Sequence, residues 1–219
     1  MSVAATPRLQ IPTLMLVTDR HLAGGEDALV AAVEAAVDGG VNAVQLREKD
    51  LPPNELLALA CRLREVTAGR ALLIVNGPQD LALEAGADGV HLPEGAEPPR
   101  PPWTFTWGRS VHSAEAALHA MAEAARYVIA GPVYATRSHI GLPPAGLALI
   151  REIVPFPRVP VIGFGGITVE RAREVIQAGA GGLAVISAIL ASESRGAAAR
   201  ALREAVDAAW PYAKKRARP

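Results

Sequence analysis

The feature of the sequence that most restricts its fold is a repeat, in which a short apolar run is followed by a segment with apolar residues at helical spacing. Eight apolar runs occur, at residues 14–19, 42–47, 71–76, 88–92, 104–110, 127–134, 159–166 and 182–190. Most segments between them are rich in alanine, and the last run is followed by a helical pattern over about 195–210. Helices that separate successive strands predict a parallel sheet, because parallel neighbours need a long crossover connection.

Eight such units in 219 residues favour an α/β fold, a single (β/α)8 TIM barrel. The alternative is a doubly wound open sheet. It is less favoured because an open sheet built from eight roughly equal units would be unusually wide. No change of composition and no Ser/Gly linker divides the chain, so we expect one TIM-barrel domain over residues 1–219. Residues 1–13 are expected to form an N-terminal tail, and residues 211–219 a basic C-terminal tail.

The connection after the fourth run should lack an ordinary helix. It reads PEGAEPPRPPW and holds five prolines between Pro93 and Pro102. Proline removes a hydrogen bond from a helix interior and clashes with the preceding turn. The sequence therefore predicts a reduced, Pro-rich connection after strand four.

The composition limits the class of partner. Half of the residues are hydrophobic, and Lys plus Arg balance Asp plus Glu at 22 each. A chain without net charge has no long-range field to attract nucleic acid or an anionic membrane, so we expect a small-molecule partner.

No uncharged apolar segment is long enough to span a bilayer, and the N-terminus lacks a signal-peptide pattern, which predicts a cytoplasmic protein. Cys61 is the only cysteine, which excludes an internal disulfide, and its apolar surroundings predict a buried helical position. The sequence leaves homo-oligomer formation open.

The second apolar run ends in a cluster of charge, AVQLREKD at residues 43–50. In a barrel of this type the carboxyl ends of the strands open onto the active site. Gln45, Arg47 and Lys49 share strand parity, so they would lie on one face and point into a substrate pocket if the strand extends that far. The alternative is that residues 47–50 form a solvated loop.

Polar residues also end several other strands. They are Asn76, His91, Ser110 with His112, Thr136 with Ser138 and His139, and Ser187. A single asparagine or histidine at a strand end is most often structural. Their joint placement at one end of the predicted barrel indicates a binding site.

The segment GFGGIT at residues 163–168 is typical of a phosphate site. It follows an apolar strand and precedes a helix whose expected N-cap is Thr168, so backbone N–H groups and the positive helix end converge. Phosphate sites of barrels often form from the loops after strands seven and eight. Phe164 and Ile167 break the spacing of a dinucleotide fingerprint, so no nicotinamide cofactor is expected. The predicted phosphate-binding residues are Gly163, Gly165, Gly166, Ile186 and Ser187.

Six motifs of the chain are informative together, in the order QLREK, GADGVHL, GRSVHS, YVIAGPVYAT, IGFGGIT and GLAVISAI. They resemble the thiamine phosphate synthase superfamily, which includes the synthase and the related thiazole tautomerases, and the resemblance covers residues 14–189. It implies a (β/α)8 barrel. In the synthase, a pyrimidine diphosphate loses pyrophosphate, and the nitrogen of a thiazole phosphate captures the resulting cation.

The resemblance also implies roles for individual residues. Gln45, Arg47 and Lys49 would hold the pyrimidine diphosphate, and Asn76 and Ser110 would line its site. Thr136 and Ser138 would contact phosphate groups. The thiazole phosphate would be bound by Gly166, Ile186 and Ser187.

Departures from the synthase pattern concern magnesium. The pattern has acidic residues for Mg²⁺ at the positions of Gly77 and Ala96, and a basic residue at the position of His139. Magnesium needs oxygen ligands, which the side chains of glycine and alanine do not supply. Glu94 and Glu97 are the substitutes left open. We therefore expect no metal and no cofactor, except that Mg²⁺ would be needed if the chain were a synthase.

The resulting functional hypothesis is a metal-independent, thiazole tautomerase-like isomerase of thiamine biosynthesis that binds a thiazole phosphate. The tautomerase pattern has a histidine after the glycine that ends strand six, where this chain has Pro132. His139 and His112 are the remaining acid/base candidates. His139 is preferred because its loop passes Thr136 towards the phosphate end, whereas His112 could cap the next helix. A thiamine phosphate synthase and a non-catalytic thiazole-phosphate binding protein are the alternatives.

Overall fold

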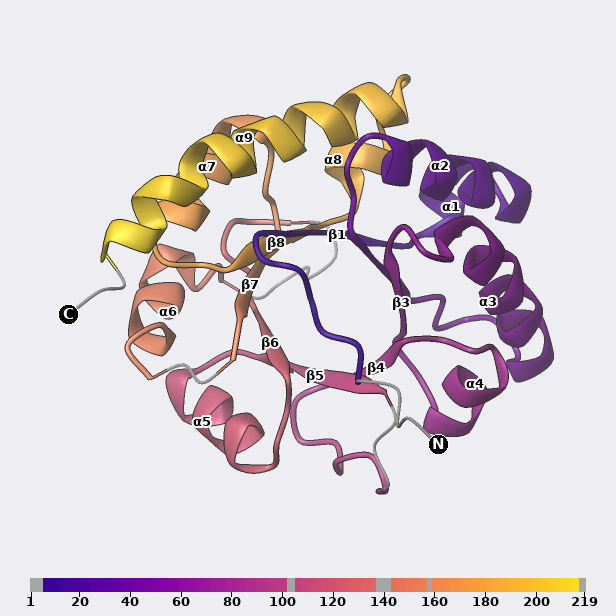
Figure 1. The fold of residues 1–219 in the computed structure, drawn as a ribbon, viewed down its shortest axis with the longest axis horizontal. Coiled ribbons are helices and arrows are strands. Elements are labelled where there is room, and N and C mark those ends of the chain that lie inside the picture. The colour runs from indigo at the N-terminus through magenta and orange to yellow at the C-terminus, as the bar shows by residue number, and fades with distance from the viewer. Residues whose placement is uncertain (1–5, 102–104, 137–142, 157–158, 217–219) are drawn as a thin grey trace.

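The computed structural model, which describes residues 6–101, 105–136, 143–156 and 159–216, is a closed barrel of parallel strands. Neighbours in the barrel follow chain order, and β8 pairs with β1 to close it (Figure 1). The strands are β1 (Thr13–Val17), β2 (Ala43–Leu46), β3 (Leu72–Val75), β4 (Gly89–Leu92), β5 (Thr106–Val111), β6 (Tyr127–Ala130), β7 (Val161–Phe164) and β8 (Gly182–Val185). The predicted (β/α)8 fold is confirmed.

Helices surround the barrel as an outer layer (Figure 1). They are α1 (Arg20–Ala23), α2 (Glu26–Asp38), α3 (Pro53–Thr67), α4 (Gln79–Glu84), α5 (Ala114–Ala122), α6 (Gly146–Ile153), α7 (Val169–Gln177), α8 (Ser187–Leu190) and α9 (Arg195–Arg216). The last and longest, α9, packs along α7 and α2 and so covers the seam where β8 meets β1.

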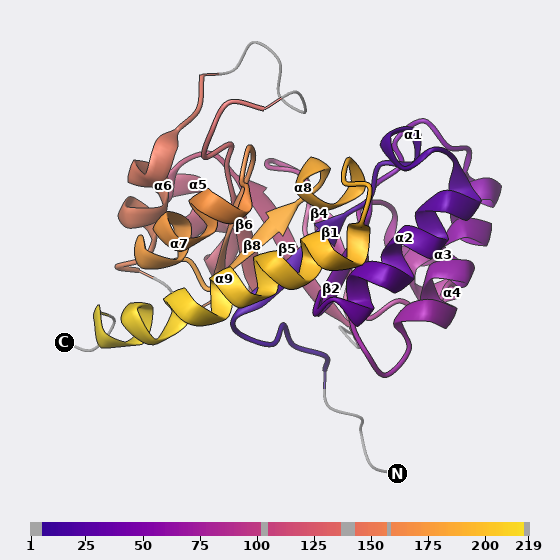
Figure 2. The ribbon, with the colours of Figure 1, turned by 90° about the horizontal axis from the view of Figure 1, so that it is seen from above.

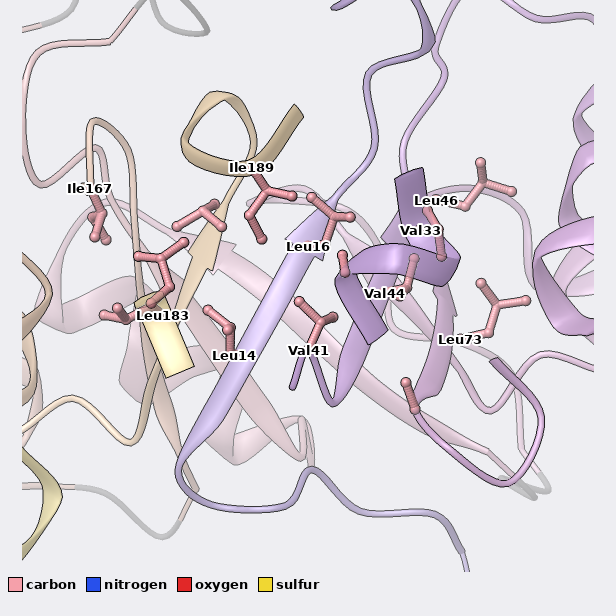
Figure 3. Close-up of a cluster of buried hydrophobic side chains, with 14 of the residues drawn as sticks. Leu14, Leu16, Val33, Val41, Val44, Leu46, Leu73, Ile167, Leu183 and Ile189 are labelled. Carbon is pink, nitrogen blue, oxygen red and sulfur yellow. The ribbon is translucent and has the colours of Figure 1, made fainter. Parts of the chain in front are cut away.

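The strands alternate between two buried clusters. In β1, Leu14 and Leu16 face the helices and belong to the same buried cluster as Val33 of α2 (Figure 3), whereas Met15 and Val17 face the barrel interior. This alternation follows from the period of two in a β-strand. Because both faces are buried, the strands read as continuous apolar runs, which made them visible in the sequence.

The Pro-rich connection after β4 contains no helix in its described residues 93–101 and 105, as predicted. A buried arginine fixes part of it: Arg109 of β5 donates to the backbone oxygen of Ala96 and to Glu123. The charged side chain thus replaces an apolar helix as the support of this segment.

Three sequence-based details are wrong. The helix α9 continues to Arg216, so residues 211–216 are helical rather than a tail. Strand eight does not extend to Ser187, because β8 ends at Val185 and the short helix α8 begins at Ser187. Cys61 does lie on a helix, α3, but is exposed, because the apolar positions of α3 that face the barrel are Leu56, Leu59, Ala60 and Leu63.

The two ends of the barrel are distinct. Figure 2 shows α1 and α8, which follow the carboxyl ends of β1 and β8, on one side of the barrel, and the N-terminal segment leaving on the opposite side. Active sites of this fold lie at the carboxyl end of the strands. Among the described helices, none is both long and apolar enough to cross a membrane.

Candidate active site

A cavity of about 200 Å³ lies at the carboxyl end of the barrel. It collects residues from most of the strands, which the sequence places far apart. Its walls are formed by Val17, Gln45, Arg47, Lys49, Asn76, His91, Pro93, Glu94, Ser110, His112, Ile129, Gly131 and Phe164. Four of the polar residues singled out at strand ends therefore do meet here, namely Asn76, His91, Ser110 and His112. Ile129 and Phe164 supply an apolar wall that was not foreseen.

The charged segment after β2 keeps its alternation beyond the strand. Arg47 and Lys49 line the cavity, although β2 ends at Leu46. Glu48 points the other way, is buried, and accepts hydrogen bonds from the backbone N–H of Arg20 at 3.1 and 3.2 Å. A second bond, from the backbone N–H of Arg47 to the hydroxyl of Thr18 at 2.9 Å, fixes the same turn. The segment is thus tied to the loop after β1 and is not a freely solvated loop.

Polarity changes with depth in the cavity. Gln45 is only 2% exposed and accepts a hydrogen bond from the side-chain amide of Asn76 at 3.3 Å. Arg47 is partly buried and Lys49 is exposed, so the positive charges lie at the rim. A ligand with an uncharged ring and an anionic tail would fit this gradient with its tail outward.

A second, smaller hollow adjoins the first at Phe164, which lines both. Its other walls come from the loop after β6 and the carboxyl ends of β7 and β8: Thr136, Gly165, Gly166, Ile167, Ala184, Val185, Ile186 and Ser187. Four of the five predicted phosphate-binding residues are among them. Within the described residues, no acceptor is paired with the backbone N–H groups of Gly165, Gly166 and Ser187.

Glycine is required at positions 165 and 166. Their φ angles are +98° and +63°, in the left-handed region that favours glycine. A Cβ at residue 166 would also lie 2.6 Å from the backbone oxygen of Ala135. The two glycines thus let the loops after β6 and β7 touch, and this contact forms the wall of the hollow.

Two predicted features of the phosphate segment differ in the structure. A Cβ at Gly163 would point at Val175 of α7, 2.5 Å away, so this residue faces the helices and does not line the hollow. Thr168 is the N-cap of α7, but its hydroxyl donates to Glu170 at 2.6 Å and does not accept a capping hydrogen bond from a backbone N–H. Ser138 and His139 lie outside the described residues.

The two described histidines of the cavity differ in environment. His112 is at the rim, where its backbone N–H and its Nδ1 contact the Glu94 carboxylate at 2.8 and 2.7 Å. His91 is fully buried and contacts the hydroxyls of Ser110 and Tyr127 at 2.8 and 3.2 Å. Burial, with a smaller contribution from the Arg47 charge, lowers the pKa of His91 to about 3.

The described residues at the carboxyl end of the barrel do not supply the oxygen ligands that a magnesium ion needs. Gly77 and Ala96 stand where the synthase pattern has acids, and neither offers a side-chain oxygen. Within the described residues, no group of three or more His, Cys, Asp or Glu side chains is placed to hold a metal ion. Glu94 is the only carboxylate among the cavity residues given above, and it is engaged by His112.

Comparisons with known proteins agree on one family. A family model described as thiamine monophosphate synthase matches residues 14–189. A thiamine-phosphate synthase of Methanoculleus marisnigri is 43% identical, with 90% of this chain and 96% of the relative covered. One of Albidiferax ferrireducens is 40% identical, with 94% and 97% covered. Among solved structures, a thiamine phosphate pyrophosphorylase of Pyrococcus furiosus superposes with a TM-score of 0.82 at 35% identity, covering 90% of this chain and 96% of that one.

Proposed function

Because this chain belongs to the thiamine monophosphate synthase family, we propose that it joins a pyrimidine diphosphate to a thiazole phosphate and releases pyrophosphate. The tautomerase-like hypothesis is wrong, since relatives about 40% identical over most of the chain are named synthases. The acid/base roles of His139 and His112 were predicted under that hypothesis, and they stay untested predictions.

The observation that carries the proposal is the pair of hollows that share Phe164. A reaction between two phosphorylated substrates needs two anion sites with a common boundary at which the reacting atoms meet. The larger cavity offers cations at its rim, and the smaller offers backbone N–H groups that have no acceptor among the described residues. Holding both reactants in this way converts a bimolecular step into an effectively unimolecular one.

The larger cavity suits the pyrimidine diphosphate. Arg47 and Lys49 at the rim would bind the diphosphate, and the ring would lie inward against Val17 and Ile129. In the reaction the carbon–oxygen bond to the diphosphate breaks, and pyrophosphate leaves with the electron pair. Cations fixed beside the departing oxygens stabilise the charge that develops there, which lowers the barrier.

The smaller hollow suits the thiazole phosphate. The N–H groups of Gly165, Gly166 and Ser187 and the side chain of Thr136 surround it and would hold the phosphate. The ring nitrogen would then face the larger cavity past Phe164 and donate its lone pair to the pyrimidine carbon, forming the new carbon–nitrogen bond. None of these roles passes through a metal ion.

The test measures synthase activity while each substrate is varied in turn. Arg47→Gln should raise the KM for the pyrimidine diphosphate about tenfold to hundredfold, because a hydrogen bond to a charged group contributes about 1.5–3 kcal/mol. Thr136→Val should raise the KM for the thiazole phosphate by a similar factor of about ten to a hundred. Each variant should leave the other KM nearly unchanged.

Arg62→Gln is the matched control, since Arg62 lies on the surface of α3 and pairs with Asp27 at 2.6 Å. It should behave as the wild type. Equal effects of Arg47→Gln and Thr136→Val on both KM values would contradict the assignment of two separate sites. A wild-type protein that forms no product at all would contradict the proposed reaction itself.

A further inference from the structure

Three polar side chains form a chain of contacts across the strands β4, β5 and β6. The hydroxyl of Tyr127 lies 3.2 Å from Nδ1 of His91, and Nε2 of His91 lies 2.8 Å from the hydroxyl of Ser110. Tyr127 and His91 are buried, whereas Ser110 is partly exposed and lines the larger cavity. The chain therefore runs from the barrel interior to the substrate site.

A glycine makes the contact between Tyr127 and His91 geometrically feasible. In the barrel register, Gly108 of β5 pairs with His91 on one side and with Tyr127 on the other. A Cβ at residue 108 would lie 2.3 Å from the Tyr127 ring, so the ring occupies the place of the missing side chain. The phenol thereby crosses β5 and reaches His91, and the two rings stack with centroids 5.7 Å apart.

Ser110 lies two residues beyond Gly108 on the same strand. Side chains repeat their direction every two residues along a strand, so Ser110 lies on the same inward face one step closer to the cavity. His91 is thus held between the Tyr127 hydroxyl in the barrel interior and the Ser110 hydroxyl at the cavity.

The histidine is neutral at physiological pH, because burial lowers its pKa to about 3. A neutral imidazole carries one N–H donor and one acceptor nitrogen. Two arrangements are therefore conceivable, one with the proton on Nε2 and one with the proton on Nδ1.

The Tyr127 hydroxyl determines which nitrogen of His91 carries the proton. No partner other than His91 contacts the Tyr127 hydroxyl in the described residues. If Nδ1 carried the proton, the phenol would accept that bond and leave its own hydrogen buried without an acceptor, which costs about 1–3 kcal/mol. If Nε2 carries the proton, the phenol donates to Nδ1 and Nε2 donates to Ser110, so both buried donors are satisfied.

We propose that Tyr127, acting through His91, fixes Ser110 as a hydrogen-bond donor to a ring nitrogen of the pyrimidine substrate. Since the Ser110 oxygen already accepts from Nε2, its own hydrogen is directed to the cavity. Tyr127 and His91 are positioning residues, and Ser110 is the residue that contacts the substrate.

Ser110 should contact a ring nitrogen and not the diphosphate, because Ser110 lies deeper in the cavity than the cations at the rim. The identity of this ligand as a pyrimidine diphosphate rests on the proposed function. The cations Arg47 and Lys49 at the rim take the diphosphate, so the ring lies deeper, beside Ile129 and Ser110. The acceptors on an aminopyrimidine ring are its two nitrogens, and a hydroxyl with a fixed donor role matches them.

The binding test uses an aminopyrimidine diphosphate and its two deaza analogues, in which one ring nitrogen is replaced by C–H. Calorimetry should show that one analogue binds wild type about threefold to tenfold more weakly than the parent, the value of one neutral hydrogen bond. Ser110→Ala should bind the parent and that analogue equally.

Tyr127→Phe separates a positioning role from a structural one. It should weaken binding of the parent by about threefold to tenfold, but add nothing in the Ser110→Ala background, because it acts through Ser110. Tyr134→Phe, which removes a hydroxyl that donates to Glu174 on the surface, is the matched control and should bind like wild type. Additive losses in the double variant would overturn the proposal.

Nitrogen NMR of histidine-labelled protein reads the proton position directly, without turnover. His91 should show a protonated Nε2 and an unprotonated Nδ1 in wild type, and a mixture in Tyr127→Phe. A protonated Nδ1 in wild type would overturn the proposal even if the synthase reaction occurs. Conversely, the expected proton position with no synthase activity would leave the donor chain standing and contradict the proposed function.

Discussion

Individual residues determine how charge is distributed at the mouth of this barrel. Arg47 and Lys49 face the cavity, while Glu48 between them turns away and binds the loop after β1. A single shift of register would bury the two cations behind the strand and place a carboxylate at the site of the diphosphate. The side-chain alternation of one short segment therefore gives the mouth its positive charge.

Buried His91 should make stability depend on pH. Its pKa is about 3 in the folded protein and about 6.5 when exposed, so the unfolded chain binds the extra proton between these values. The free energy of unfolding should therefore fall as the pH drops below about 6.5. Between pH 7 and pH 5, urea titrations should show a loss of about 2 kcal/mol from this group.

His91→Gln should remove most of that loss, whatever its effect on absolute stability. His119→Gln, on the exposed surface of α5, is the control and should keep the wild-type slope. A His91→Gln protein with an unchanged slope would show that His91 is not held neutral.

Gly166→Ala should be more destabilising than Gly69→Ala, although both residues have positive φ angles, +63° and +70°. Both variants incur the left-handed penalty of about 1–2 kcal/mol. Only at residue 166 does the new methyl also meet the backbone oxygen of Ala135, at 2.6 Å, whereas residue 69 has open space. Denaturant unfolding should show an extra loss of about 1–3 kcal/mol. Equal losses would mean that the loops after β6 and β7 are not in close contact.

The sequence predicted correctly which side chains face the cavity where the alternation along a strand determines their direction. It was wrong where packing against other elements determines it. Parity placed Gln45, Arg47 and Lys49 together in the cavity. Gly163 was grouped with its neighbours because the motif is glycine-rich, but within β7 it alternates to the helix side. Tyr127 gave no signal at all, because its reach to His91 depends on the absence of a side chain at Gly108 in another strand.

At the scale of elements, the loops after β3 and β4 are the unusual part of this chain. They carry Gly77 and Ala96 where the family resemblance implies acids, and the second loop is braced by Arg109 instead of a helix. The sequence indicated both the loss of the acids and the loss of the helix. It did not indicate the brace, because Arg109 lies within an apolar strand and its partners are distant.

Restoring the two acids should create magnesium affinity. A Cβ at Gly77 meets nothing closer than 3.5 Å, so Gly77→Asp fits without strain. Wild type should bind Mg²⁺ weakly in calorimetry, and Gly77→Asp combined with Ala96→Asp should bind at least about tenfold more tightly. The single variants are the matched controls and should remain weak. Tight binding by wild type that Glu94→Gln abolishes would show instead that Glu94 builds a metal site.

Element boundaries were less predictable than element order. The switch from β8 to α8 at Ile186 is hidden in the continuous apolar run GLAVISAIL. Similarly, the helical pattern of α9 was expected to stop near Trp210, where Pro211 follows, but the helix continues to Arg216. Apolar runs and prolines mark elements without fixing their ends.

At the scale of the whole molecule, the barrel brings eight strand ends to one edge, so that residues from Val17 to Ser187 line two adjacent hollows. The repeat pattern predicted this fold, and a combination of short motifs identified the family. The specific reaction was not predictable in the same way, because the missing acids and Pro132 pointed away from a synthase whereas the overall similarity pointed to one. A single domain and a cytoplasmic location stay predictions from the sequence. The formation of a homo-oligomer stays open.

Product formation by the purified protein with both substrates, with and without Mg²⁺, tests the proposed synthase reaction. A pyrimidine diphosphate and a thiazole phosphate together should yield the joined monophosphate and one equivalent of pyrophosphate, and neither substrate alone should yield either product. Mass spectrometry of the reaction mixture detects both. Binding of the thiazole phosphate with no joined product under any of these conditions would show that the protein is not a synthase and indicate a non-catalytic binding protein.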